Sequence, residues 1–246
     1  MSPAPALALE RVERTHASGA GRFVLEVDAF AVRRGEAVAL TGPSGTGKST
    51  MLDLLALASR PGAAGRFVLA TREGGEVDVA AAWDADDLDL LTRTRAVHVG
   101  YVLQQGGLLP FLTLRQNMRL AQRVGGRGDA ARIDELARRL GIDGLLDRKP
   151  ATLSVGQRQR AAIARALAHG PEIVLADEPT ASVHPALADT VLALLVEQVR
   201  AADAALVIAT HDPDRASRHG IEICAAILAA DGTARSRFSR PPGVGP

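Results

Sequence analysis

Apolar residues along the chain follow two patterns, short continuous runs and longer runs with helical spacing. The continuous runs are typical of strands covered on both faces: EAVAL (36–40), EIVLA (172–176) and AALVIAT (204–210). The runs KSTMLDLLALAS (48–59) and PALADTVLALLVEQVRAA (185–202) have the spacing of amphipathic helices. Apolar strands that alternate with helices predict an α/β fold with a parallel sheet.

The segment from about 112 to 167 has no strand signal and is helix-like throughout. We therefore expect a helical subdomain at about 105–168, inserted into a single domain that spans residues 1–246. Residues 22–42 predict short strands broken at Arg33–Gly35. The last residues, from about 236 to 246, are rich in Pro and Gly and predict a flexible tail.

Composition excludes several classes of protein. With 246 residues, 47% of them hydrophobic, the chain can bury a large core. A formal net charge of +1 gives no reason to expect nucleic acid as a partner. Cys224, the single cysteine, lies among apolar residues and is expected to be a buried thiol in a reducing compartment. Neither a signal peptide nor an apolar run long enough to span a bilayer is visible, which predicts a cytoplasmic chain.

The first candidate site is GPSGTGKST, which lies between a predicted strand and a predicted helix. It matches the phosphate-binding pattern G-x-x-x-x-G-K-[ST] at every fixed position. Its glycines let successive backbone N–H groups face one anion, and the helix N-terminus adds a positive dipole. The expected nucleotide-binding residues are Gly42, Pro43, Ser44, Gly45, Thr46, Gly47, Lys48, Ser49 and Thr50. Among them Lys48 would meet the β- and γ-phosphates and Ser49 would bind Mg²⁺.

Acidic and basic groups follow two other predicted strands. Asp177 and Glu178 end the strand after EIVLA, and His211 follows AALVIAT. One carboxylate at such a strand end can orient Mg²⁺ and another can polarise the attacking water. His211 could donate a hydrogen bond to the γ-phosphate.

Five segments in this order resemble the ATPase subunit of ATP-binding cassette (ABC) transporters. They are GPSGTGKST, YVLQQ with Gln104, LSVGQRQRAAIARALA, IVLADEPTAS and ATHD. The resemblance covers about residues 8 to 232. It implies a P-loop NTPase fold, with a RecA-like core, an antiparallel β subdomain and the inserted helical subdomain, and it implies hydrolysis of ATP with Mg²⁺.

By the same resemblance, Glu178 is the general base, His211 contacts the γ-phosphate, and Gln104 senses Mg²⁺ and the attacking water. Ser49, Gln104 and Asp177 form the metal site. Two cassettes pair head to tail in the family, so that Ser154, Gly156 and Gln157 close over the nucleotide of the other chain. Because the sequence contains one cassette and no repeat, the chain is expected to form a homodimer.

This sequence departs from the family pattern at three places. Val155 replaces the first glycine of the usual LSGGQ, which is tolerable where the backbone φ is negative. His184 stands where an aspartate usually helps to couple the two sites. The tyrosine that stacks on adenine is absent, and His16 occupies roughly that position.

The stretch GGLLPFLTLRQNM resembles the lipoprotein-releasing and macrolide-exporter group of ABC ATPases. That resemblance implies integral membrane permease subunits as partners, contact with the membrane only through them, and a place on the inner face of the cell membrane. Two alternatives remain open, the ATPase of a small-solute or amino-acid importer and a weakly hydrolysing regulatory cassette. Soluble ABC proteins of translation or of chromosomes are disfavoured, since the chain has neither a second cassette nor a long coiled coil.

Overall fold

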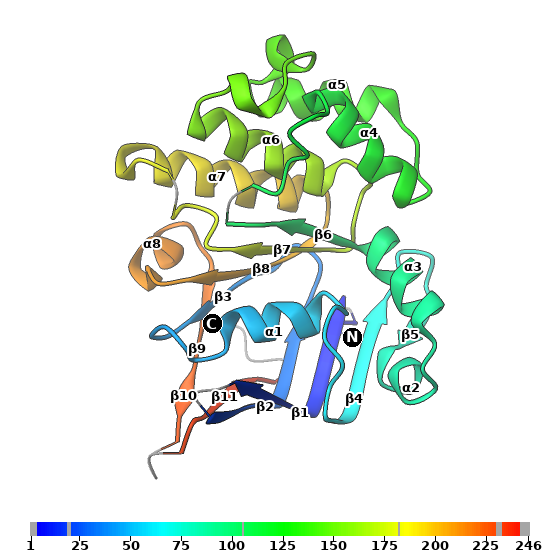
Figure 1. The fold of residues 1–246 in the computed structure, drawn as a ribbon, viewed down its shortest axis with the longest axis vertical. Coiled ribbons are helices and arrows are strands. Elements are labelled where there is room, and N and C mark those ends of the chain that lie inside the picture. Colours follow the sequence, from blue (N-terminus) through cyan, green and yellow to red (C-terminus); the bar gives the residue numbers. More distant parts are fainter. Residues whose placement is uncertain (1–3, 19–20, 105, 182, 230–232, 242–246) are drawn as a thin grey trace.

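The computed structural model describes residues 4–18, 21–104, 106–181, 183–229 and 233–241 (Figure 1). Within them, five strands form a parallel sheet in the order β6-β7-β8-β3-β9. These strands are β3 (Ala37–Thr41), β6 (Val99–Val102), β7 (Ile173–Asp177), β8 (Ala205–Thr210) and β9 (Glu222–Ala225). Three of them contain the continuous apolar runs, which confirms the predicted α/β class.

Helices cover both faces of the parallel sheet. Helix α1 (Lys48–Leu55) lies on one face, and α6 (Val155–Leu167) and α7 (Pro185–Ala201) lie on the other (Figure 1). Successive residues of β8 alternate between the two cores. Leu206 and Ile208 pack with α6 and α7, whereas Val207 packs with α1. This burial on both faces explains why the strand is continuously apolar.

The first helix is shorter than its sequence pattern suggested. The apolar spacing predicted a helix over 48–59, but α1 ends at Leu55. Two residues later, Leu57 is fully buried with a φ of 55°. A helix cannot continue through that left-handed conformation, so burial of this leucine ends α1.

The remaining strands form a six-stranded sheet in the order β10-β11-β2-β1-β4-β5. They are β1 (Leu7–Ser18), β2 (Gly21–Val32), β4 (Ala63–Ala70), β5 (Glu76–Asp78), β10 (Ile227–Leu228) and β11 (Arg235–Arg240). All neighbours pair antiparallel except β11 and β2. Helix α1 is sandwiched between this sheet and the parallel one (Figure 1). The break predicted at Arg33–Gly35 separates β2 from β3.

The remaining helices lie around these layers. They are α2 (Val79–Asp84), α3 (Leu88–His98), α4 (Leu114–Val124), α5 (Ala130–Arg139), α8 (Pro213–Arg218) and the 3₁₀ helices η1 (Asp143–Leu145) and η2 (Pro150–Thr152). Between the neighbouring strands β6 and β7, the described residues contain only helices and loops. Helices α4, α5 and α6 therefore form the helical insertion, seen at the top of Figure 1.

The flexible tail predicted from about residue 236 is wrong for residues 236–240. They belong to β11, in which Ser236, Phe238 and Arg240 are buried and the residues between them are exposed. Phe238 is fully buried in the core around α1, and Arg240 forms ion pairs with Glu36 and Glu222. Strand alternation thus outweighs the polar composition of this segment. Residues 242–246 of the predicted tail lie outside the described residues.

Two smaller expectations concern Cys224 and membrane helices. Cys224 is a free, buried cysteine, and burial raises the pKa of its thiol to about 11. None of the helices in the described part of the chain combines the length and apolar character that crossing a bilayer requires.

Candidate functional site

The phosphate-binding loop connects β3 to α1 at the carboxyl edge of the parallel sheet. Lys48 is only 7% exposed, and its Nζ donates to the carbonyl oxygens of Gly42 at 2.8 Å and Pro43 at 3.0 Å. Gly47 caps α1 with a φ of 83°, and a Cβ there would lie 2.9 Å from the ring of Phe23. Glycine is required at this position both by its φ and by the close approach of the aromatic ring.

Electrostatics match a phosphate cradle. Burial lowers the pKa of Lys48, while the nearby carboxylates of Glu178 and Asp177 act in the opposite direction. The loop thus holds a partly desolvated cation, which an anionic ligand would stabilise.

A pair of oxygen donors lies at the foot of the loop. Ser49 Oγ donates to Asp177 Oδ2 at 3.1 Å, although the two residues are far apart in the sequence. Ser49 lies in the first turn of α1 and Asp177 ends β7, so the fold itself brings them together. Hydroxyl and carboxylate oxygens are ligands that Mg²⁺ prefers, and the amide of Gln104 lines the same cleft.

Glu178 follows Asp177 in a left-handed conformation, with a φ of 45°. Its N–H donates to the carbonyl of Ala209 on β8, which holds this conformation in place. The carboxylate Oε1 lies 3.0 Å from His211 Nε2. Burial raises the pKa of Glu178, although His211 and Lys48 oppose that shift. A strained residue with a raised pKa at a strand end has the properties of a general base.

These groups meet in one cleft of about 540 Å³. Its lining residues are His16, Phe23, Ser44, Gly45, Gly47, Lys48, Ser49, Thr50, Gln104, Asp177, Glu178, Ala181 and His211. Gly42, Pro43 and Thr46 belong to the same loop but do not line the cleft. Thr46 instead donates to the carbonyl of Pro43 at 2.9 Å and shapes the turn.

Phe23 is a cleft residue that sequence reasoning missed. It lies opposite His16 in the antiparallel pair of β1 and β2, so an aromatic ring and an imidazole share the rim of the cleft. The alternation along β2 and the hairpin register were the signals that could have identified Phe23.

The signature segment lies outside this cleft. Ser154 caps α6, because the Gln157 N–H donates to its Oγ at 3.3 Å and the Ser154 N–H donates to Gln157 Oε1 at 2.9 Å. Val155 is the first residue of the helix, is 41% exposed, and does not adopt a positive φ. A Cβ on Gly156 would meet only Leu187, at 3.8 Å. The N-terminus of α6 is therefore open to a ligand from outside the chain.

His184 caps the next long helix. The N–H of Ala186 donates to His184 Nδ1 at 3.3 Å at the start of α7. His184 thus takes over the capping role that an aspartate performs well, but without the negative charge.

Comparison with known proteins identifies the family. A family model described as ABC transporter matches residues 25–181. The lipoprotein-releasing system ATP-binding protein LolD of Maricaulis maris is 40% identical over 218 residues, which cover 86% of this chain and 90% of that protein. LolD of Anaeromyxobacter dehalogenans is 42% identical over 212 residues, covering 83% of this chain and 84% of that protein.

Solved structures agree with these relatives. The dimeric structure of MJ0796, a bacterial ABC transporter cassette, matches with a TM-score of 0.72 and 32% identity, covering 89% of this chain and 93% of that chain. A post-hydrolysis state of MJ0796 bound to ADP and Pi matches with a TM-score of 0.71. Given a family match over more than half of its length and these relatives, the chain belongs to the ABC transporter family as one of its ATP-binding, ATP-hydrolysing cassettes.

Proposed function

We propose that this cassette works as a homodimer and powers a membrane permease of the lipoprotein-releasing kind. The observation that carries the proposal is the meeting of Lys48, Asp177 and Glu178 in one cleft, in a chain similar to LolD proteins. The cassette itself provides the nucleotide chemistry. The separate permease would provide the path or the mechanical work, on the inner face of the cell membrane.

For hydrolysis, each residue has a separate role. Lys48 and the N–H groups of the loop bind the β- and γ-phosphates. Glu178 accepts a proton from the water whose oxygen attacks the γ-phosphorus, and ADP leaves with the electrons of the broken P–O bond. His211, 3.0 Å from Glu178, holds that carboxylate in place and can donate to the γ-phosphate.

Magnesium fits the oxygen atoms at the foot of the loop. Ser49 and Asp177 would hold it, with Gln104 next to them in the cleft. When bound, the ion neutralises charge on the phosphate oxygens.

The adenine would bind at the rim of the cleft formed by β1 and β2. His16 and Phe23 face each other across the hairpin, and either ring can stack on a purine. The phenyl ring compensates for the tyrosine that the family usually has.

The homodimer follows from the position of the signature segment. Ser154, Gly156 and Gln157 do not line the cleft of their own chain. A two-fold dimer would place each α6 N-terminus against the γ-phosphate bound by the other chain, where its dipole and free N–H groups stabilise the anion.

The permease would dock on an apolar groove beside α3 and α4. This groove, of about 320 Å³, is lined by Tyr101, Leu103, Leu120 and Val124, with Arg95 and Arg165 among its other residues. Leu103 lies directly before Gln104 and Tyr101 lies three residues before it, so a permease segment bound in the groove would contact the strand end that leads into the nucleotide cleft.

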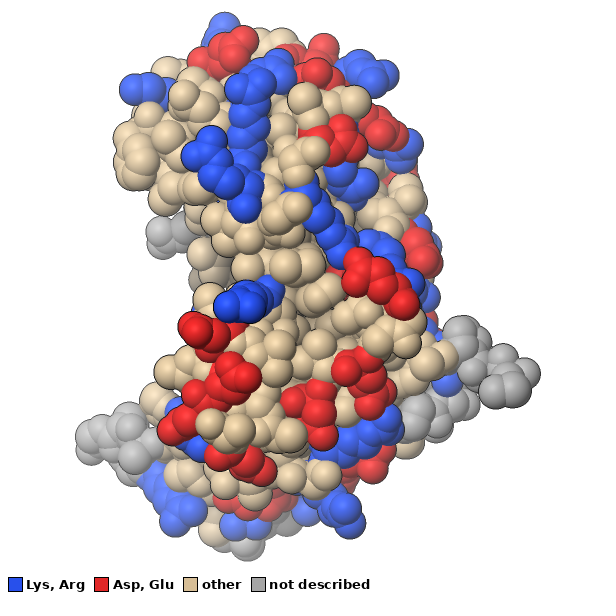
Figure 2. Space-filling model, turned by 90° about the vertical axis from the view of Figure 1, so that its right-hand side faces the viewer, with Lys and Arg blue, Asp and Glu red and all other residues tan. Residues whose placement is uncertain are grey.

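Charge around the groove is unevenly distributed. Figure 2 shows the face that carries α2 and α3, where basic side chains run down the middle of the upper half with acidic ones near its edges, and acidic side chains cross the lower half with basic ones near the bottom. On α2, α3 and the turn between them, the exposed acidic residues are Asp84, Asp86, Asp87 and Asp89. An apolar permease segment with an acidic residue would complement the two arginines of the groove.

A weakly hydrolysing regulatory cassette is the second candidate, and Val155 and His184 favour it. The rate of ATP turnover distinguishes this candidate from the permease-driving cassette. The purified chain should hydrolyse Mg-ATP, and Glu178→Gln should retain ATP binding without turnover. A parent chain that binds ATP but does not turn over, even with its permease, would support the regulatory cassette.

Coupling can be tested with the permease reconstituted in vesicles. Val124→Asp, on the 60% exposed Val124 of the groove, should abolish stimulation by the permease and leave basal ATPase unchanged. Ala131→Asp on the exposed surface of α5 is the matched control. Release of a labelled lipoprotein from the vesicles would favour the leading proposal, and uptake of a small solute would favour an importer.

A further inference from the structure

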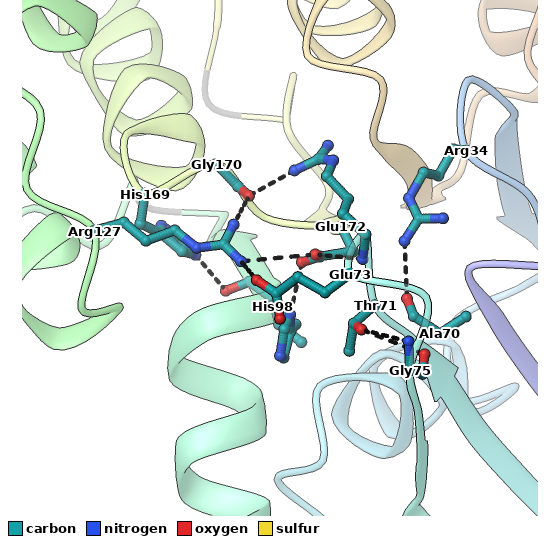
Figure 3. A network of polar contacts seen from close by, with 12 residues as sticks. Arg34, Ala70, Thr71, Glu73, Gly75, His98, Arg127, His169, Gly170 and Glu172 are labelled. Carbon is teal, nitrogen blue, oxygen red and sulfur yellow. Dashed lines mark hydrogen bonds and ion pairs between the residues drawn. The ribbon is translucent and has the colours of Figure 1, made fainter.

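A buried carboxylate, that of Glu172, lies just before β7, at the end of the strand opposite to Asp177 and the nucleotide cleft. Figure 3 shows its surroundings. Glu172 is fully buried, and its Oε2 lies 2.8 Å from His98 Nδ1. Its Oε1 accepts from the N–H of Arg72 at 3.3 Å and lies 3.9 Å from Arg127 Nη2. Burial acts to raise the pKa of Glu172, but the contacts with His98 and Arg72 outweigh it and lower the pKa. The Glu172 carboxylate is therefore a buried charge that depends on these partners for its stability.

The two residues of the closest pair stand at the starts of the strands that lead to the catalytic groups. His98 directly precedes β6, which leads to Gln104, and Glu172 directly precedes β7, which ends at Asp177. Val99 and Ile173, the next residues, are paired in the sheet. The contact between His98 and Glu172 thus holds these strands together about 17 Å from the catalytic carboxylates, the length of a five-residue strand.

The same network holds the far end of the signature helix. The carbonyl oxygen of Gly170 follows α6 and accepts from Arg72 Nη1 at 2.8 Å and from Arg127 Nη1 at 3.0 Å. The signature segment lies at the other end of α6, about 20 Å away along a helix of 13 residues.

The two arginines come from different parts of the fold. Arg72 lies on the turn between β4 and β5 and also donates to Ala202 and Asp203 at the end of α7, at 2.6 and 2.9 Å. Arg127 comes from the loop between α4 and α5, and its Nη2 lies 3.7 Å from the exposed Glu73. The antiparallel sheet, the helical insertion and the parallel sheet therefore meet at Gly170 and Glu172 (Figure 3).

We propose that Arg127 is a positioning residue that fixes the signature helix relative to the nucleotide edge of its own chain, by binding Gly170 and Glu172. This proposal rests on the proposed homodimer. In a two-fold dimer each chain presents both a signature segment and a phosphate-binding loop, so both sites close together only when their spacing within one chain is correct. A loose signature helix would leave nucleotide binding intact and weaken dimer closure.

The first measurement reports spacing within one chain and does not depend on dimer formation. Spin labels at Val155→Cys on α6 and Asp214→Cys on α8, in a Cys224→Ala background, give a distance distribution for the isolated chain without nucleotide. Arg127→Ala should broaden or shift this distribution. Arg123→Ala, on the exposed last turn of α4, is the matched control and should leave it unchanged. An unchanged distribution in Arg127→Ala overturns the proposal.

A second measurement connects spacing to assembly. In the Glu178→Gln background, sedimentation with Mg-ATP should show the dimer dissociation constant raised about tenfold by Arg127→Ala, or about 1.4 kcal/mol. Arg127→Lys, which keeps the charge but not the forked geometry, should fall between the parent and Arg127→Ala. Binding of a fluorescent ATP analogue to the dilute monomer should stay within about twofold.

The outcomes separate the two proposals. A parent chain that remains monomeric with Mg-ATP counts against the proposed homodimer, while the spin-label distances still decide whether Arg127 sets the spacing. Two results would overturn the positioning role. One is that Arg127→Ala weakens ATP binding to the monomer by as much as it weakens the dimer. The other is that Arg127→Ala and Arg123→Ala change the spin-label distance or the dimer dissociation constant equally.

Discussion

The two edges of the parallel sheet both collect charged residues, but they use them differently. At the carboxyl edge, Glu178 has a left-handed backbone and a raised pKa, and its charge faces an open cleft. At the opposite edge, Glu172 has a lowered pKa and is surrounded by His98, Arg72 and Arg127. Strands β6 and β7 thus lead to an open ligand-binding cleft at their carboxyl ends, and they begin at a buried polar network at their amino ends.

This difference indicates what each edge contributes to the protein. Under the proposed function, the partly compensated charges at the cleft would cost stability, and they would provide affinity for phosphate and a base for the attacking water. At the other edge the buried carboxylate has a partner at each oxygen, so that removing it would leave buried polar groups without a partner. Mutations at the cleft should therefore change activity more than stability, and mutations at the opposite edge should do the reverse.

The largest effect is expected for Glu178→Gln. Loss of the general base should lower ATP turnover by about one hundredfold to ten-thousandfold, while ATP affinity stays close to that of the parent. Steady-state phosphate release and equilibrium nucleotide binding measure the two quantities. The free energy of unfolding should not fall, because the change removes a partly buried charge in a strained position. Turnover within a few fold of the parent would remove Glu178 from the role of base.

Glu172→Ala should show the opposite behaviour. Removing this buried carboxylate leaves His98 Nδ1 without its hydrogen-bond partner and Arg127 without its counter-charge, and loss of one member of such a buried network typically costs about 3 to 5 kcal/mol of unfolding free energy. Urea unfolding measures this loss. Glu73→Ala is the control, since its side chain is 81% exposed, and it should change stability by less than about 0.5 kcal/mol. Equal stabilities of the two variants would contradict the contrast drawn between the edges.

The nucleotide edge could be predicted from the sequence, whereas the opposite edge could not. GPSGTGKST is contiguous, and Asp177, Glu178 and His211 follow apolar runs whose parallel ends must meet. Glu172, His98 and Arg72 are separated by up to 100 residues with no spacing that links them. Their partnership depends on how three layers of the fold pack, which periodicity does not encode.

Strand β11 and Phe23 were missed for a related reason. In RSRFSR the buried residues include Arg240, so the alternation is one of burial and not of hydrophobicity. Phe23 was identified as part of a strand, but its place in the cleft depends on its register with β1. Hydrophobic patterns predict helices and strands well. They predict which residues are in contact only where the fold places the ends of strands next to each other.

A third prediction concerns pH and lies next to the Glu172 network. Burial lowers the pKa of His169 from 6.5 to about 4, so the folded protein keeps this imidazole neutral where the unfolded chain binds a proton. Above about pH 6.5 both states are neutral at His169, and the free energy of unfolding is not affected. As the pH falls toward 4, proton binding favours the unfolded chain, and the free energy of unfolding decreases. The total is about 3 kcal/mol, from about 1.4 kcal/mol per unit of pKa.

The test compares the parent with His169→Gln, which can still donate to the carbonyl of Val99 that lies 3.2 Å from His169 Nε2. The unfolding free energy of the parent should fall more steeply between pH 6.5 and 4 than that of the variant. Parallel curves would show that His169 is not kept neutral by burial.

The smallest effect is expected at Val155, where the cleft of one chain would meet the signature of another. Val155 is exposed and its φ is not positive, so the helix start does not need glycine there. Val155→Gly should lower ATPase activity less than about twofold, through a more flexible helix start. Ser154→Arg should abolish cooperative hydrolysis, because its bulk would separate the two chains at the capped N-terminus of α6. A rise of about tenfold in Val155→Gly, or about 1.4 kcal/mol of barrier, would instead identify the valine as a brake on turnover. His184, which caps α7 without the usual charge, would then be the next residue to exchange.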